Sequence, residues 1–513
     1  MVTAAPQQEL PQRMHQAFAR WSRERPQANA LIDAHTTLRY GELPDAVAAV
    51  AARLAALGVR AGDRVLLVGE NCVALAVTIL ALSSLDAWSA TVNARLSRRE
   101  IDTYLAHSGA RRAVYFDRSS PDAAQHAEAA GAEALDFPVI GALRVGPLAE
   151  AAPEPVCADG AEQVAALVYT SGTTGAAKAV MLTHRNLLFV AENSRNMRRL
   201  VPDDVIYGVL PLSHVYGLSS LLGAALVSGA ALQLVPRFAP EALAHALAHD
   251  GVTVLHGVPA MYARLLDWAA RSGTALVAPR LRVAQSGGSP LTAAVKEGFE
   301  RAFGLTLNNG YGMTEASPSI CQTRLDAPRS DCSVGPAIPG IEVKLRGADG
   351  ADGVGELWVR GPNVMKGYYR APELSAEVLT PDGWLRTGDL ARIAPDGAIT
   401  IEGRAKELII RSGFNVYPVE VEQVLDSHPD VVQSAVVGRD VDGNEEVVAF
   451  IEPVAGRSLD EAALLAYLRA NLSPYKVPAR IVVLEQMPAS ATGKILKAEL
   501  RRLAAGLGDE AAS

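Results

Sequence analysis

Along most of this chain, apolar runs of strand length alternate with Ala/Leu-rich stretches of helical length, and this alternation limits the folds open to it. Strand-like runs occupy residues 64–68, 113–116, 205–210, 231–235 and 252–256. The Ala-rich stretch 45–57 predicts a helix that ends at Gly58. The alternation predicts an α/β fold. The chain has 513 residues, 49% of them hydrophobic, which is enough to bury more than one core.

The sequence pattern changes near Ile338, where turns rich in Gly, Pro and Asp begin to separate short strand-like runs. These runs predict a β-rich subdomain that closes the large domain. Past Arg404 the sequence predicts helices at the EVEQVL segment and from Asp460 to Asn471, together with three strands. We therefore expect a large N-terminal domain, residues 1–405, and a small α+β C-terminal domain, residues 406–513.

The net charge and the cysteine spacing limit the classes of function and the cellular compartment that fit this sequence. A net charge of −8 argues against a broad nucleic-acid-binding surface. The four cysteines lack C-x-x-C spacing, so neither a zinc site nor a disulfide framework is indicated. Polar and charged residues interrupt the N-terminus before an apolar signal segment can form. We expect a cytoplasmic protein.

One uncharged stretch, residues 216–235, is nominally long enough to cross a bilayer, which takes about 20 residues. It contains three glycines, several serines and Gln233. These residues favour a buried helix followed by a strand, and we expect no transmembrane segment.

The stretch YTSGTTGAAKAV, residues 169–180, follows the apolar run 164–168 and predicts a strand that leads into a phosphate-binding loop. Glycines let backbone N–H groups curl around an anion, hydroxyls add donors, and Lys178 supplies a mobile cation. The spacing of its glycines and lysine differs from that of a Walker A motif. A Ser/Thr/Gly-rich turn alone is often a surface linker, so other motifs must support the interpretation.

Further motifs follow in a fixed order, and together they resemble the adenylate-forming superfamily of acyl-CoA synthetases. They are PLSHVYG at 211–217, SGGSPL at 286–291, NNGYGMTE at 308–315, TGD at 387–389, GRAKELIIRSGFNVYP at 403–418 and ATGKILK at 491–497. The family usually has Pro before the loop lysine and Gly after it, where this chain has Ala177 and Ala179. The resemblance covers most of the chain and implies a C-terminal domain that moves.

The resemblance assigns an ATP/AMP site. Its implied residues are Thr170, Ser171, Gly172, Thr173, Thr174, Gly175 and Lys178 for the phosphates, Gly287, Gly288, Ser289, Asn309, Gly310, Tyr311, Gly312, Met313 and Thr314 around adenine and phosphate, Asp389 for ribose, Arg404 for ribose or phosphate, and Lys494. Glu315 is the expected Mg²⁺ ligand, since hard cations prefer carboxylate and phosphate oxygens. An acceptor-only carboxylate such as Asp389 also suits the two hydroxyls of ribose.

The resemblance also implies catalytic, acyl, hinge and thiol-binding positions. The expected catalytic residues are Lys494, Glu315, Thr170 and His214. Lys494 would stabilise the charge that develops between the carboxylate and the α-phosphate. His214 would line the pocket and would not act as a general base. The acyl pocket would be lined by His214, Val215, Tyr216, Gly217, Ser286 and Gly312. Lys406 matches the hinge, and Ser412, Gly413 and Phe414 would approach CoA.

The function implied is an ATP- and Mg²⁺-dependent acyl-CoA synthetase for an apolar monocarboxylic acid, fatty or aromatic. Residues 211–222 carry no formal charge with His214 neutral, which is typical of an apolar pocket. The alternative is a stand-alone adenylating enzyme that loads a carrier protein, and a third possibility is a noncatalytic nucleotide-binding relative. The implied partners are the carboxylic acid, ATP and CoA, with a homodimer left open as the assembly.

Overall fold

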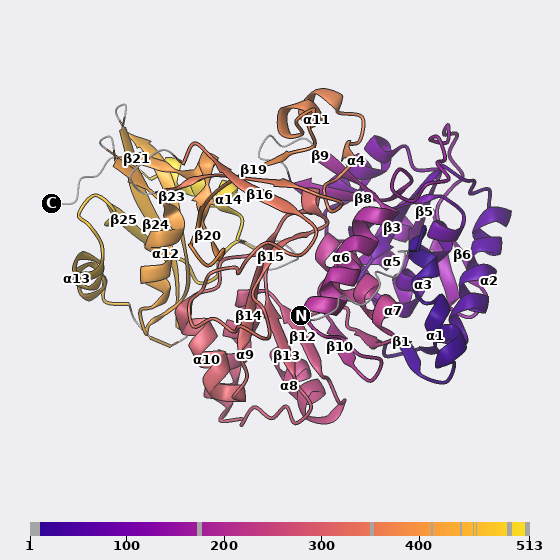
Figure 1. The fold of residues 1–513 in the computed structure, drawn as a ribbon, viewed down its shortest axis with the longest axis horizontal. Helices are drawn as coiled ribbons and strands as arrows, with labels where there is room; N and C mark the ends of the chain where they lie inside the picture. The colour runs from indigo at the N-terminus through magenta and orange to yellow at the C-terminus, as the bar shows by residue number, and fades with distance from the viewer. Residues whose placement is uncertain are drawn as a thin grey trace.

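The computed structural model describes residues 11–171, 177–348, 353–411, 414–441, 444–454, 456–457, 459–489 and 495–507, with only the backbone described at Ser171 and Ala177. Two large sheets, each covered by helices, form the N-terminal part, and a smaller unit follows it (Figure 1). This confirms the predicted α/β fold with a large N-terminal and a small C-terminal part.

The first large sheet has eight strands, of which the six inner ones are parallel. Its order is β15 (Ser319–Gln322), β14 (Leu307–Gly312), β13 (Val283–Ser286), β12 (Val254–Gly257), β10 (Val205–Gly208), β11 (Ala231–Leu234), β1 (Asn29–Ile32) and β2 (Thr37–Arg39). The helices between or beside these strands are α7 (Ala224–Ser228), α8 (Pro240–His249), α9 (Pro259–Ser272) and α10 (Ala293–Phe303).

The second large sheet also has eight strands. Its order is β18 (Gly367–Tyr368), β9 (Ala177–Thr183), β8 (Val164–Ser171), β4 (Trp88–Asn93), β3 (Arg64–Gly69), β5 (Arg112–Tyr115), β7 (Gly141–Val145) and β6 (Glu133–Phe137). Its accompanying helices are α1 (Ala19–Glu24), α2 (Leu43–Ala56), α3 (Val73–Ser84), α4 (Arg98–Ser108), α5 (Pro121–Ala129) and α6 (His184–Met197).

Helix α3 shows why the two sheets share a core. Its sequence VALAVTILALSS is apolar on every side, a pattern typical of a fully buried helix. Ten of its residues are buried, and one hydrophobic cluster joins it to strands of both sheets, including β3 and β11. Cys72 precedes the first residue of the helix and its sulfur accepts the Leu75 N–H, so this cysteine serves as a structural cap.

The uncharged stretch 216–235 forms the π-helical segment η3 (Tyr216–Gly223), then α7 and β11. Most of it is buried, which confirms the predicted helix followed by a strand. Among the residues that the structure describes, no helix combines the length and the hydrophobicity needed to cross a bilayer.

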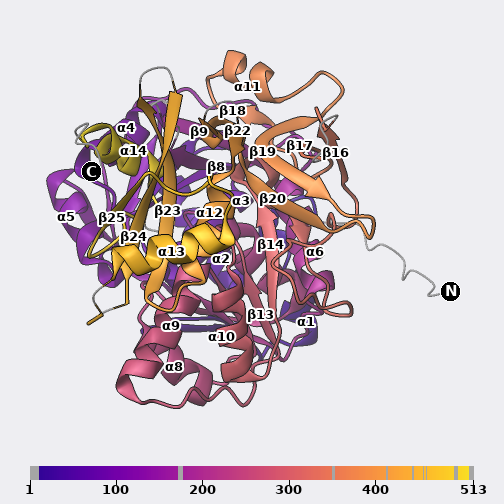
Figure 2. The same ribbon diagram turned by 90° about the vertical axis from the view of Figure 1, so that its left-hand side faces the viewer.

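The β-rich subdomain is a four-stranded antiparallel sheet, β16 (Glu342–Arg346), β17 (Gly355–Arg360), β19 (Leu385–Ile393) and β20 (Ile399–Arg404), with helix α11 (Pro372–Val378) nearby. The C-terminal unit faces the viewer in Figure 2. It contains β21 (Ile409–Arg411), β22 (Phe414–Val416), α12 (Pro418–Asp426), β23 (Val431–Val441), β24 (Asn444–Pro453), α13 (Glu461–Asn471), β25 (Arg480–Val483) and α14 (Lys497–Ala505).

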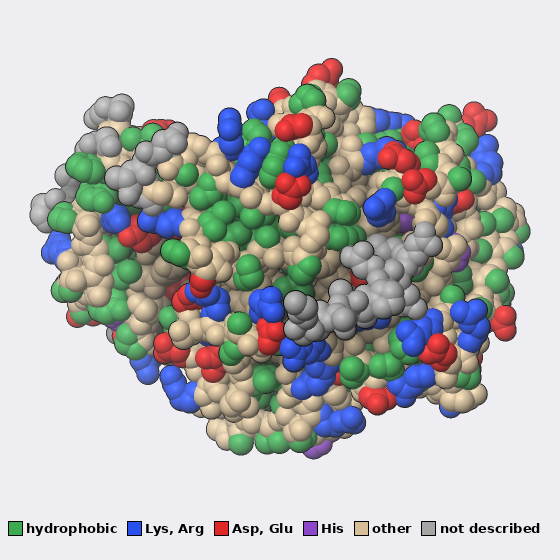
Figure 3. Space-filling view, viewed as in Figure 1, with side chains coloured by type: hydrophobic (Ala, Val, Ile, Leu, Met, Phe, Trp, Pro, Cys, Tyr) green, Lys and Arg blue, Asp and Glu red, His purple; other side chains and the backbone are tan. Residues whose placement is uncertain are grey.

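The C-terminal unit has hydrophobic clusters of its own. Every residue of these two clusters lies at or beyond Ile409, whereas the clusters of the N-terminal part extend no further than Ile401. The core is therefore interrupted between Ile401 and Ile409. On the face shown in Figure 3, basic and acidic side chains are interspersed, without a broad basic surface.

Candidate active site

The predicted phosphate-binding stretch is an antiparallel hairpin over the residues that the structure describes. Strand β8 continues through Tyr169 to Ser171, and Lys178 lies on β9 directly opposite Thr170. The strands therefore extend further into the motif than the sequence predicted, because the consecutive residues 169–171 pair with residues 177–179 across the hairpin. Gly172, Thr173, Thr174 and Gly175 lie outside the described residues, as does the side chain of Ser171.

Tyr368 connects two predicted site residues that are distant in sequence. It lies on β18, which pairs with β9, and the Lys178 ammonium stands 5.6 Å from the centroid of its ring. Its hydroxyl donates to Glu315 Oε1 at 2.8 Å. Burial and the neighbouring Glu315 charge both raise the pKa of Tyr368, so the phenol stays neutral and keeps its donor.

Tyr368 was missed by the sequence analysis because it belongs to no recognised motif. A two-residue strand gives no periodic signal, and a tyrosine beside Tyr369 resembles ordinary core packing. Glu315 is further fixed through its backbone, since its carbonyl accepts the Met365 N–H at 2.9 Å.

A second group joins three predicted nucleotide residues. Asp389 and Arg404 face each other across β19 and β20, and Arg404 Nε lies 3.1 Å from Asp389 Oδ1. The Tyr311 hydroxyl donates to Asp389 Oδ2. Burial and the Asp389 charge raise the pKa of Tyr311, which keeps this phenol protonated. The Asp389 side chain is 6% exposed and that of Arg404 45%, so the pair lies at the edge of the protein interior.

Close backbone contacts explain two of the predicted glycines. A Cβ on Gly312 would stand 2.0 Å from the carbonyl oxygen of Pro318, and one on Gly217 would stand 2.2 Å from that of Pro211. No side chain fits at either position without moving the backbone. Gly310 pairs with Gln322, so β14 and β15 hold the adenine motif in an antiparallel ladder.

The predicted adenine-pocket residues differ in how much of their side chains is free to contact a ligand. The Asn309 side chain already forms hydrogen bonds within the protein, because its Nδ2 donates to the Cys332 carbonyl at 2.9 Å and its Oδ1 accepts the Gly310 N–H. Thr314 is buried, Met313 and Ser289 are half-buried, and Gly288 is exposed. Gly288 has a φ of +84°, a left-handed conformation that favours glycine.

The predicted acyl motif lies directly beside these residues. The Tyr216 ring stands 3.3 Å from the position that a Cβ of Gly287 would take. His214 Nδ1 accepts the Tyr216 N–H at 3.3 Å, which fixes the turn that leads into η3. Val215 and Ser286 are fully buried. The structure thus brings the predicted acyl and adenine motifs into contact.

Lys406 and Phe414, the described residues among the predicted hinge and CoA positions, lie at the beginning of the C-terminal unit. Lys406 is exposed within the short 3-10 helix η5 (Ala405–Glu407). Phe414 is 54% exposed and stacks on Tyr475, with ring centroids 4.6 Å apart. Lys497 pairs with Glu407 and Glu422 and links η5 to α12. Ser412, Gly413 and Lys494 lie outside the described residues.

Glu315 fits the role of a metal ligand only together with a substrate. Within the described ranges, no three His, Cys, Asp or Glu side chains converge in a way that could hold an ion. Glu315 uses Oε1 to accept the Tyr368 hydroxyl, and no hydrogen bond to Oε2 is present in the described part of the chain. A Mg²⁺ ion that keeps waters and bridges one carboxylate to phosphate oxygens suits this donor set.

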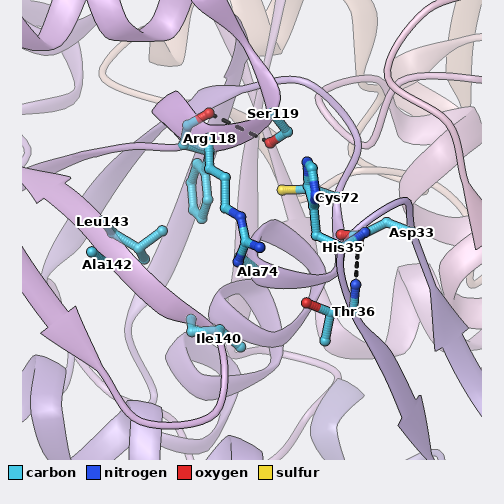
Figure 4. Close-up of a pocket in the computed structure, with 11 residues that line it drawn as sticks. Asp33, His35, Thr36, Cys72, Ala74, Arg118, Ser119, Ile140, Ala142 and Leu143 are labelled. Atoms are coloured by element: carbon cyan, nitrogen blue, oxygen red, sulfur yellow. Dashed lines mark hydrogen bonds between the residues drawn. The ribbon is translucent and has the colours of Figure 1, made fainter.

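A separate pocket lies where α3 begins (Figure 4). Asp33, His35, Cys72 and Arg118 are among the side chains that line it. Asp33 already accepts the His35, Thr36 and Val73 N–H groups, so its carboxylate holds the loop and the helix start. None of the predicted site residues lines this pocket.

Comparison with known families identifies matches in both parts of the chain. The family model described as AMP-binding enzyme matches residues 18–369, and the one described as AMP-binding enzyme C-terminal domain matches residues 420–494.

Relatives align with nearly the whole chain. The feruloyl-CoA synthase of an Amycolatopsis species is 37% identical over 494 residues, which cover 94% of this chain and 97% of that protein. The indoleacetate–CoA ligase of Aromatoleum aromaticum is 34% identical, with coverage of 91% and 93%. Among solved structures, ATP-bound MatB from Rhodopseudomonas palustris has a TM-score of 0.81 at 30% identity, covering 96% of this chain and 99% of its own.

Proposed function

This chain belongs to the AMP-binding enzyme family, and from that premise we propose that it is an AMP-forming acyl-CoA synthetase. The observation that carries the proposal is the convergence of the motifs. Lys178 and Glu315 meet at Tyr368, while Tyr311, Asp389 and Arg404 form one hydrogen-bonded group. Cation, carboxylate and donor groups are the chemistry that an ATP site needs.

In the first step, an oxygen of the substrate carboxylate attacks the α-phosphorus of ATP. A new phosphorus–oxygen bond forms, the bond to the leaving pyrophosphate breaks, and acyl-AMP results. Lys178 and the hairpin donors around Thr170 would bind the phosphates, and Asp389 would accept from the ribose hydroxyls. Lys494 would stabilise the charge that builds on the transferring oxygens.

Magnesium would be held at Glu315 together with phosphate oxygens. When bound, it neutralises phosphate charge and so favours departure of pyrophosphate. The Tyr368 hydroxyl, which donates to Glu315 Oε1 at 2.8 Å, would keep the other carboxylate oxygen directed toward the ion.

In the second step, the thiol of CoA attacks the acyl carbonyl carbon, the thioester forms, and AMP leaves. We propose that the C-terminal unit turns about Lys406 between the two steps, with the domain boundary between residues 405 and 406. The interruption of the core between Ile401 and Ile409 supports this boundary. Exposed Phe414, with Ser412 and Gly413, would then approach the thiol arm of CoA.

For the acid, we propose an apolar-bodied carboxylate, with aromatic acids favoured over fatty ones. Feruloyl-CoA synthase and indoleacetate–CoA ligase are both named for aromatic acids. The acyl motif from His214 to Gly217 contributes no formal charge with His214 neutral, in keeping with an apolar body. Loading of a carrier protein is the second candidate, since the same first step serves both acceptors.

The proposed cytoplasmic location and a homodimeric assembly need separate measurements. Cell fractionation addresses the first, and light scattering of the purified chain addresses the second.

Pyrophosphate release with ATP and Mg²⁺ tests the function directly, against aromatic, fatty, dicarboxylic and amino acids, each with and without CoA. Release that depends on the acid and rises with CoA is the expected result. Acid-dependent release that is indifferent to CoA would point to another acceptor. No release with any acid would contradict the proposal.

A further inference from the structure

Next to the acyl motif lies a set of buried polar side chains without partners. Arg198 is 2% exposed, and its Nε and Nη1 atoms have no hydrogen-bond partner in the described part of the chain. Both ring nitrogens of fully buried His256 and the hydroxyl of fully buried Ser220 are also unpartnered there. Buried polar groups normally have partners, so a set of three requires an explanation.

These groups connect to the proposed acyl site through Tyr216. The Tyr216 and His256 rings meet edge to face, with centroids 5.8 Å apart, and the Tyr216 ring also lies against Gly287. Ser220 belongs to η3, the segment that Tyr216 begins. Arg198 directly follows α6, which packs along η3 and whose Leu187 carbonyl accepts the Ser219 hydroxyl at 2.8 Å.

The charge of Arg198 reaches both aromatic residues. Burial, followed by the Arg198 charge, holds the pKa of His256 well below its usual range, so this imidazole is neutral. Burial raises the pKa of Tyr216, and the Arg198 charge opposes that rise. Arg198 is therefore the cation of this cluster, with a neutral histidine and a neutral phenol beside it.

In the part of the chain that the structure describes, no carboxylate compensates this cation. None of the ion pairs within the described residues includes Arg198, and the nearby Asp204 is occupied by Arg282 and Thr253. A buried charge without a counter-ion lowers the stability of a protein by roughly several kcal/mol. An oxyanion that arrives with the substrate would remove this cost, and a carboxylate matches the planar fork of guanidinium donors.

We propose that Arg198 is a specificity-determining residue that binds a second carboxylate at the far end of the acyl substrate. The inference rests on the proposed function, since the reacting carboxylate must lie at the nucleotide end of the same site. Ser220 would donate to the second carboxylate, and His256 would donate from whichever ring nitrogen carries the proton. The substrate class is thus a dicarboxylic acid whose two acid groups are joined by an apolar body.

The assay is acid-dependent exchange of pyrophosphate into ATP, measured without CoA. Each dicarboxylic acid of a series with aliphatic and aromatic bodies is compared with its monomethyl ester, which keeps the body between the two acid groups, adds one methyl group and removes one charge. The wild-type protein should show kcat/KM at least about tenfold higher for the free diacid of the preferred length, the scale of one hydrogen-bonded charge pair.

Arg198→Met should abolish this preference and leave kcat/KM for the monomethyl ester within about threefold of the wild type, since the nucleotide end is unchanged. Arg199→Met is the matched control, because the neighbouring Arg199 side chain is 65% exposed and pairs only loosely with Asp326 at 3.6 Å. It should keep the wild-type ratio.

A wild-type preference for monoesters or for acids without a far carboxylate would overturn the assignment of Arg198. An unchanged ratio in Arg198→Met would do the same. In both cases exchange itself persists, so the proposed function survives. Loss of exchange with every acid in the wild type would instead contradict the proposed function. If Arg198→Met does not fold, the wild-type ratio across the series decides.

Discussion

Two phenols organise the charged groups of the proposed active site. Tyr368 donates to Glu315 beside Lys178, and Tyr311 donates to Asp389 beside Arg404. In both pairs burial raises the pKa of the phenol and keeps it protonated, so the carboxylate is the acceptor. Each carboxylate is thereby oriented before any ligand binds. This orientation lowers the entropic cost of ordering the site when the ligand binds.

Tyr368→Phe tests this orientation at the residue scale. Loss of the hydroxyl frees Glu315 Oε1, and we expect the Mg²⁺ concentration for half-maximal activity to rise about tenfold, the scale of one hydrogen bond to a charged group. Steady-state rates of pyrophosphate release across a Mg²⁺ titration measure the effect. Tyr369→Phe is the control, since that neighbouring hydroxyl donates to Glu154, outside the proposed site. Equal Mg²⁺ dependence in both variants would contradict the role given to Tyr368.

At the scale of elements, the turn that leads into η3 depends on the absence of a side chain at position 217. Gly217→Ala would place a methyl group 2.2 Å from the Pro211 carbonyl oxygen, and the turn must then move. We expect a loss of about 1–3 kcal/mol in the free energy of unfolding, together with a raised KM for the acid. Urea denaturation and acid titration measure the two effects.

Gly146→Ala is the matched control for this substitution. A Cβ there would meet its nearest neighbour at 3.5 Å, an ordinary contact. A loss of stability equal to that of Gly217→Ala would show that the close approach at Pro211 is not the cause.

Helix α12 contains an acid that the fold keeps protonated. Burial, opposed by Ser434 and assisted by Glu422, raises the pKa of Asp426 to about 8, and its Oδ1 is buried without a hydrogen-bond partner among the described residues. An unfolded aspartate has a pKa of about 3.9. Between those two values the folded state holds a proton that the unfolded chain has released, so stability decreases as the pH rises.

Asp426→Asn should therefore gain stability relative to the wild type as the pH rises from about 5 to about 8, by at most about 1.4 kcal/mol per pH unit. Hydrogen exchange of the α12 amides, compared between the two proteins at each pH, measures the difference and cancels the intrinsic pH dependence of exchange. A difference that stays constant with pH would rule out a buried proton at Asp426.

The sequence predicted the elements well where periodicity and turn residues agree. The strand at 64–68, the helix ending near Gly58 and the C-terminal helix starting after Asp460 all have their expected places. Tyr368 and Arg198 could not be predicted, because their roles come from neighbours that only the folded chain brings together. The hairpin of β8 and β9 is longer than expected because cross-strand pairing extends into a motif whose composition predicts a loop.

The proposed two-step mechanism requires that the C-terminal unit moves while the hydrophobic clusters of both parts stay intact. Lys406→Pro fixes φ within the short connection between the cores, where the movement must occur. We expect the rate of acyl-AMP formation to stay within about threefold of the wild type. The rate of thioester formation from supplied acyl-AMP should fall about 100-fold or more, because one misplaced donor at a reaction centre costs about 10²–10³ in rate.

Lys406→Ala is the control for this variant and should retain both half-reactions, because the exposed ammonium is given no chemical role. Unimpaired thioester formation in Lys406→Pro would exclude Lys406 as the hinge. A similar loss in both half-reactions would indicate general damage to the fold.

The most direct test of the account is to follow the oxygen atoms of the acid. The substrate is supplied with ¹⁸O in its carboxylate, together with ATP, Mg²⁺ and CoA, and the products are analysed by mass spectrometry. Attack of the carboxylate on the α-phosphorus leaves one ¹⁸O in AMP when the thiol displaces it, and this is the predicted result. Label in pyrophosphate or phosphate, or thioester formation with unlabelled AMP, would contradict an acyl-adenylate intermediate.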